Sequence, residues 1–128
     1  MESTVSIEQF RDELQSWKHE LSSIKEEIRQ FEQQLEKMAN RTLPKDLLAL
    51  VEHFQNQFIC QKEVIDTLRH DLPDSRHKVE NIFHHYRSDS QLGNWDSSTE
   101  GLEGRMDTFR KIYIEIKQNF HRFESDWI

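Results

Sequence analysis

The chain has 128 residues, a formal net charge of −7, and similar shares of hydrophobic and charged residues, 34% and 32%. This length suits one domain, and this balance suits long helices with one narrow apolar stripe and a wide solvated face. The acidic charge argues against binding to a nucleic-acid backbone, which requires clustered Lys and Arg. No apolar run approaches the roughly 20 residues of a membrane span, and no signal peptide is recognisable. The single cysteine, Cys60, excludes an intrachain disulfide and favours a reducing, cytoplasmic location.

A heptad repeat of apolar residues, with steps alternating between three and four, is the strongest pattern in the chain. Its members are Ile7, Phe10, Leu14, Trp17, Leu21, Ile24, Ile28, Phe31, Leu35 and Met38. This period predicts one amphipathic helix over about residues 4–40. The rings of Phe10, Trp17 and Phe31 share one heptad position, and a two-stranded coiled coil accommodates such bulk poorly. The pattern therefore favours a bundle of three or more helices.

Charged residues flank this repeat, and the two sides differ in sign. The basic side holds Arg11, Lys18 and Lys25, and the acidic side holds Glu13, Glu20 and Glu27. In a parallel pair of two copies, the glutamates would reach lysines of the partner. Within one chain, they would instead meet Arg110 and Lys117 of a parallel third helix. The sequence leaves both arrangements open.

A second heptad repeat follows a short turn that ends at Pro44, and this short link predicts an antiparallel hairpin. The repeat comprises Leu47, Val51, Phe54, Phe58, Gln61, Ile65, Leu68 and Leu72. Its phase continues beyond Pro73, so we expect one helix over about residues 44–87 that is kinked near Pro73. The alternative is a break at Asp71–Asp74, which would give four helices. Gln61 is polar, and it is either partly solvated or a buried contact that sets the register.

Turn-forming residues over 88–98 predict a loop, and a capping box at Ser97–Glu100 predicts a third helix over about residues 99–127. Its heptad residues are Leu102, Met106, Phe109, Tyr113, Ile116, Phe120, Phe123 and Trp127. The three repeats together predict an all-α fold. We expect a single domain over residues 1–128, folded as an elongated antiparallel three-helix bundle with coiled-coil-like packing.

Two short segments resemble a spectrin-type three-helix repeat. Phe10–Trp17, with the sequence FRDELQSW, is similar to the first helix of such a repeat, and Leu50–Phe54 is similar to the second. The insertion between Pro73 and Ser97 departs from that layout, and Tyr113 stands where a Trp would be typical. The resemblance implies a three-helix architecture, and an analogy of fold assigns no function.

A surface for self-association is expected because the third helix is too short to cover a second helix that runs to Arg87. The open part of the apolar seam should then act as a partner or dimer surface. Its residues are Val79, Ile82, Phe83, Tyr86 and Trp95. No Gly-rich phosphate loop, Cys-x-x-Cys pair or nucleophile elbow is present, so we expect no catalytic residues and no cofactor. The first hypothesis is a non-enzymatic protein–protein interaction or scaffold module, expected to be a homodimer.

A second hypothesis is a metal-binding bundle that uses His70, Asp74 and His77. These residues are spaced four and three apart, so they share one helical face, and they can bind zinc if a further ligand comes from elsewhere. This face points away from the apolar seam, and His70 and His77 are separated by about 10 Å along a helix. The spacing therefore favours a solvated stripe over a metal site.

Overall fold

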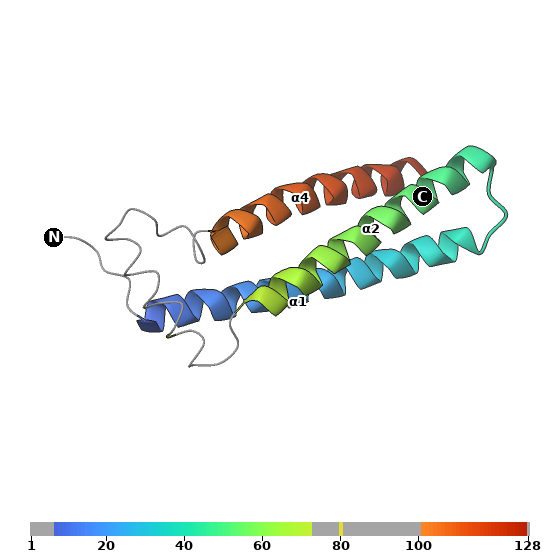
Figure 1. Ribbon diagram of the computed structural model, residues 1–128. Coiled ribbons are helices and arrows are strands. Elements are labelled where there is room, and N and C mark those ends of the chain that lie inside the picture. Colours follow the sequence, from blue (N-terminus) through green and yellow to red (C-terminus); the bar gives the residue numbers. More distant parts are fainter. Residues whose placement is uncertain (1–6, 73–79, 81–100, 128) are drawn as a thin grey trace.

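The computed structural model describes residues 7–72, 80 and 101–127. Within these residues it contains three long helices: α1 (Ile7–Ala39), α2 (Lys45–Asp71) and α4 (Gly101–Trp127). They lie lengthwise beside one another, with α1 and α4 running in one direction and α2 in the other (Figure 1). The predicted all-α three-helix bundle is confirmed.

The turn between α1 and α2 closes the antiparallel hairpin within a few residues. The Asn40 N–H donates to the Glu36 carbonyl at 3.1 Å, which extends the hydrogen bonding of α1 by one residue. Pro44 precedes α2 with φ −56° and ψ 151°, and its carbonyl accepts a 3.0 Å bond from the Leu48 N–H. A proline suits this position because the first turn of a helix has no internal partner for its N–H groups.

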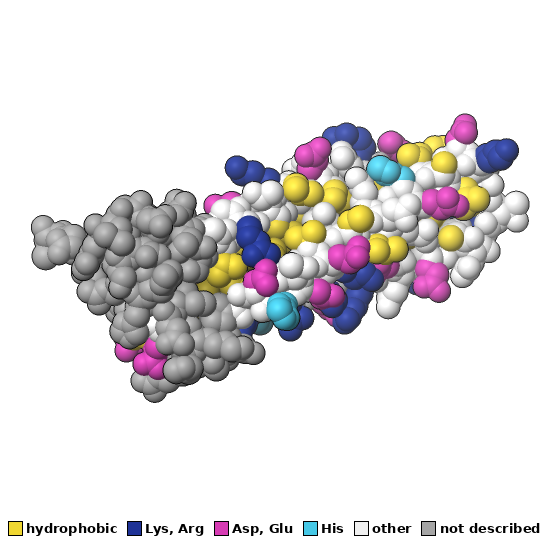
Figure 2. All heavy atoms as spheres, in the orientation of Figure 1, with side chains coloured by type: hydrophobic (Ala, Val, Ile, Leu, Met, Phe, Trp, Pro, Cys, Tyr) yellow, Lys and Arg dark blue, Asp and Glu magenta, His cyan; other side chains and the backbone are white. Residues whose placement is uncertain are grey.

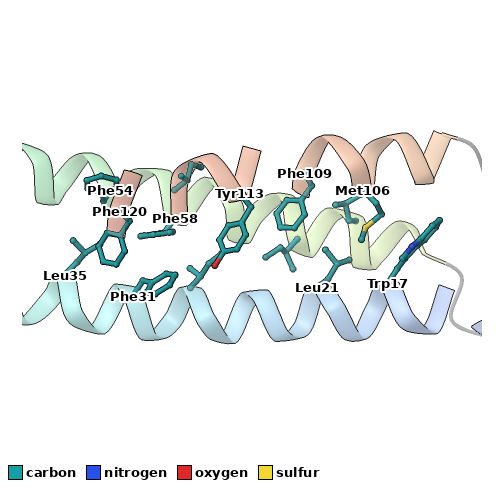
Figure 3. Packing of buried hydrophobic residues seen from close by; sticks show 14 of the residues in the cluster. Trp17, Leu21, Phe31, Leu35, Phe54, Phe58, Met106, Phe109, Tyr113 and Phe120 are labelled. Carbon is teal, nitrogen blue, oxygen red and sulfur yellow. The ribbon is translucent and has the colours of Figure 1, made fainter. Parts of the chain in front are cut away.

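Each helix contributes one apolar stripe to the core, and the stripes follow the three heptad repeats over most of their length. Ile7, Ile24 and Met38 are only partly buried, and Trp127, the last predicted heptad residue, is 52% exposed. The buried residues are Phe10, Leu14, Trp17, Leu21, Ile28, Phe31 and Leu35 of α1, Leu47, Val51, Phe54, Phe58, Gln61, Ile65 and Leu68 of α2, and Leu102, Met106, Phe109, Tyr113, Ile116, Phe120 and Phe123 of α4. Figure 3 shows part of this core, in which labelled side chains such as Leu21, Phe58 and Met106 point into the space between the helices. Burial of each large side chain stabilises the fold by about 1.5–3 kcal/mol, so this core is the main source of stability.

Phenylalanine rings from all three helices meet near the end of the bundle that holds the α1–α2 turn (Figure 3). Phe120 lies at their centre, with ring centroids 5.0 Å from Phe31, 5.3 Å from Phe58 and 5.5 Å from Phe54. The rings are tilted or perpendicular to one another, the arrangements that the ring quadrupole favours. This packing needs an interior wider than that of a two-stranded coiled coil, as the ring-bearing heptad positions predicted.

The expectation of one kinked helix over residues 44–87 is wrong at Leu72, because α2 ends at Asp71. Leu72 has an extended backbone, with φ −74° and ψ 133°. A proline at the next position disfavours the helical conformation of the residue before it, so Pro73 ends the helix. The Leu72 side chain is nevertheless buried, which explains why the heptad phase includes it. The alternative prediction, a break in the helix at Asp71–Asp74, agrees with the end of α2 at Asp71. The loop predicted over 88–98 lies outside the described residues. Between Leu72 and Gly101 only Glu80 is described, and it is helical.

Candidate functional site

The contact between α1 and α4 is lined by ion pairs that the flanking charges allowed. Arg110 binds Glu20 with both ends of its guanidinium, Nε to Oε2 at 2.7 Å and Nη2 to Oε1 at 2.8 Å. Lys117 Nζ lies 3.0 Å from Glu27 Oε2, one heptad further along. Pairs at a constant offset show that α1 and α4 are parallel and in register. Glu20 and Glu27 on the acidic side of α1 therefore pair within the chain. This is the arrangement with a parallel third helix, one of the two that the sequence left open.

Glu27 is the most interconnected carboxylate on this edge. It accepts hydrogen bonds from the Tyr113 hydroxyl and from Lys117. Burial by itself would raise the pKa of Glu27, but these two hydrogen bonds outweigh it and hold the pKa below its ordinary value of 4.5. Burial, followed by the hydrogen bond to Glu27, raises the pKa of Tyr113. Both groups therefore stay in their ordinary charge states at neutral pH, and the arrangement is structural.

The contact between α1 and α2 is also lined by ion pairs. Lys25 Nζ lies 2.6 Å from Asp66 Oδ1, and Lys62 Nζ lies 2.9 Å from Glu32 Oε1. The hydrogen bond from Lys25 lowers the pKa of Asp66. From the first pair to the second, the residue number rises on α1 and falls on α2, as antiparallel helices require. Both edges of α1 are thus occupied by contacts within the chain.

The third contact, between α2 and α4, differs because a groove of about 910 Å³ runs along its outer side. The floor is formed by Gln61 and Leu68 of α2 and by Phe109 of α4, and Val64 and Ile112 form its apolar edges. Both edges are well exposed, Val64 to 40% and Ile112 to 45%. Figure 2 shows hydrophobic side chains at the surface of the bundle, with acidic and basic side chains around them.

The groove has low walls because small residues line much of it. Cys60, Thr67 and Thr108 contribute short side chains, and Gly101 and Gly104 contribute none. A Cβ atom added at Gly104 would meet nothing within 4 Å, so the space beside it is open. Small residues let the backbone of a docked helix approach closely, while Val64 and Ile112 offer apolar contact. This combination fits a helical surface.

Gln61 is a buried polar residue in the floor of this groove. Its side chain is only 7% exposed, and its Oε1 atom has no hydrogen-bond partner among the described residues. The Oε1 of Gln57, one turn earlier on α2, is in the same state. Gln61 is therefore buried rather than partly solvated, and the described part of the structure gives its Oε1 no contact that would set the register. An unsatisfied buried oxygen costs about 1–3 kcal/mol, so Gln61 lowers the stability of the bundle.

The residues predicted as a metal site are not brought together within the described part of the chain. His70 points into solvent with 89% of its side chain exposed, and its Nδ1 lies 3.3 Å from Asp71 Oδ1. Asp74 and His77 lie outside the described residues. Among residues 7–72, 80 and 101–127, no group of three or more His, Cys, Asp or Glu side chains is placed to hold a metal ion.

The residues predicted as a partner or dimer seam all lie outside the described residues, so that prediction stays a prediction. They are Val79, Ile82, Phe83, Tyr86 and Trp95. The α2–α4 groove was not foreseen as a site. Its signal in the sequence is that Val64 and Ile112 extend the apolar stripes of their helices beyond the heptad positions.

Comparison of the chain with protein-family models, with curated proteins and with solved structures finds no match. Of the helices that the structure describes, none is long and apolar enough to cross a membrane. The function is therefore argued from the geometry of the bundle.

Proposed function

We propose that this protein is a non-enzymatic protein–protein interaction module that holds a helix in the groove between α2 and α4. The observation that supports the proposal is the groove itself, with Val64 and Ile112 exposed on its edges and small residues along its walls. A cytoplasmic location belongs to the same proposal, and the exposed thiol of Cys60 supports it.

Apolar contact supplies most of the expected binding energy. Full burial of a Val or Ile side chain is worth about 1.5–3 kcal/mol, and roughly half of that remains to be gained at edges that are partly exposed. Two such residues beside a wall of small residues form the kind of central anchor around which interfaces are built. Arg105 and Asp71, paired at 2.7 Å at one end of the groove, provide a polar rim.

The test uses a phage-displayed library of amphipathic helices, selected for binding to the full-length chain. Binders should lose affinity for Val64→Glu and for Ile112→Glu, because each change places a charge on an apolar edge. The matched control is Ile59→Glu, which introduces the same charge on α2 at a residue that is 47% exposed and does not line the groove. Binders that respond equally to Val64→Glu and Ile59→Glu would contradict the proposal, and so would a selection that yields no binder sensitive to Val64→Glu.

A further inference from the structure

Along the edge of the bundle that contains the groove, residues of α2 and α4 at the same level have matching chemistry. The ion pair between Asp71 of α2 and Arg105 of α4 fixes which residues lie side by side. Because α2 and α4 are antiparallel, one heptad forward on α4 corresponds to one heptad back on α2. This step places Val64 beside Ile112, and both line the groove. A second step places Gln57 beside Asn119. The successive levels are therefore ionic, apolar and amide.

Such a face is complementary to a copy of itself under one particular symmetry. A two-fold axis parallel to the helices sets α2 of one copy against α4 of the other at the same level. Asp71 would then meet the partner's Arg105, and Val64 would meet the partner's Ile112. Every pairing between copies repeats a pairing that already exists within one copy, with charge against opposite charge and apolar against apolar. A two-fold axis perpendicular to the helices at the level of Val64 would instead set Asp71 against Gln57.

We propose that the occupant of the α2–α4 groove is a second copy of this chain, related by a two-fold axis parallel to the helices. This inference rests on the proposed function, because it names the partner that the groove holds. Four apolar side chains, Val64 and Ile112 from each copy, form the central layer of the interface. The small residues Thr108 and Gly104 leave room for the opposing helix beside that layer.

The exposed thiol of Cys60 offers a direct probe of this geometry, because it lines the groove and is the only cysteine in the chain. In the dimer the two α2 helices lie on a diagonal. For helices packed about 9 Å apart, the axes on this diagonal are roughly 13 Å apart, so Cα atoms that face one another across it are roughly 8 Å apart. That separation is too long for a disulfide and suits a short bismaleimide linker.

The experiment measures the mass of the full-length chain by sedimentation equilibrium, with circular dichroism to show that each variant is folded. The wild-type chain should be a dimer, and bismaleimide should link it through Cys60. Val64→Glu and Ile112→Lys should each weaken dimerisation by roughly tenfold or more, because each places a charge against an apolar surface. Ile59→Glu should leave dimerisation unchanged.

Mixing the two disruptive variants gives the sharpest result. In a mixed dimer, the carboxylate introduced at position 64 of one copy faces the ammonium introduced at position 112 of the other. The second pair of edges keeps its native Val64 and Ile112. The mixture should therefore recover a dimer of one Val64→Glu chain and one Ile112→Lys chain, at a concentration at which each variant alone dimerises far less.

Three results would overturn the inference. A wild-type dimer that Ile59→Glu disrupts and Val64→Glu does not would place the interface elsewhere. A dimer that both groove variants disrupt, with no recovery on mixing, would rule out the α2-to-α4 pairing. A wild-type monomer would exclude a second copy as the occupant. A monomer that still binds groove-specific displayed helices would leave the proposed function intact with a different partner, whereas a monomer that binds none would contradict both.

Discussion

Replacing Gln61 with leucine should stabilise the bundle. Gln61 occupies a heptad position among buried apolar residues, and its Oε1 has no hydrogen-bond partner among the described residues. A buried polar oxygen in this state costs about 1–3 kcal/mol. Leucine has a similar volume, so the substitution removes that cost without leaving a cavity. We expect the free energy of unfolding to rise by about 1–2 kcal/mol, which for a domain of this size raises Tm by roughly 3–8 °C.

Urea denaturation followed by circular dichroism measures this change, and an unaltered m value would show that the unfolded reference is the same. Gln118→Leu is the matched control, because Gln118 is exposed on α4 and the same substitution there should change stability by less than about 0.5 kcal/mol. A Gln61→Leu protein that is no more stable than the wild type would refute the reasoning. That result would mean that the Gln61 oxygen is satisfied, with an internal water as the simplest partner.

Two further perturbations test the core and the α1–α4 edge. Phe120→Ala should lower the free energy of unfolding by about 3–5 kcal/mol, measured in urea, because the fully buried ring contacts phenylalanines of both other helices; a loss below about 1 kcal/mol would contradict the central role of this ring. The pKa of Glu27 is depressed on folding, so its ionised form stabilises the bundle above pH 4.5, and this contribution is lost as the pH falls through the lower pKa of the folded state. Glu27→Gln should therefore cost less than about 1 kcal/mol at pH 7, since the group is partly exposed, and should flatten the loss of Tm on acidification. An acid transition identical in both proteins would show that other carboxylates control it.

The sequence predicted the helices and much of the contact between them, because heptad residues and flanking charges are local patterns with a fixed geometric meaning. One of the two interpretations of the charges that flank the first helix pairs Glu20 with Arg110 and Glu27 with Lys117. Both ion pairs are present, and so is the parallel third helix that they require. The sequence did not predict the end of α2. A heptad pattern indicates which side chains are buried, but it does not show whether the backbone stays helical. Leu72 is buried in the core although its backbone is extended.

The groove was beyond sequence reasoning for a different reason. Val64 and Ile112 extend the apolar stripes of their helices, but their juxtaposition depends on the level of α2 relative to α4. That level is set by the Asp71–Arg105 pair and by the packing of the core, since the two helices are separated in sequence by residues 72–100. Two exposed apolar residues become one site only after this register is known.

The distribution of ion pairs explains why self-association belongs to the α2–α4 face and not to the first heptad repeat. A coiled-coil partner recognises the charged flanks of a helix, and each flank of α1 already has two ion pairs within the chain. Lys25 and Glu32 bind Asp66 and Lys62 on one side, and Glu20 and Glu27 bind Arg110 and Lys117 on the other. At the α2–α4 edge the flanking positions after Asp71 and Arg105 are apolar, and Val64 and Ile112 remain exposed. A partner there gains apolar contact at Val64 and Ile112. The heptad pattern that builds the bundle therefore leaves one edge available for assembly.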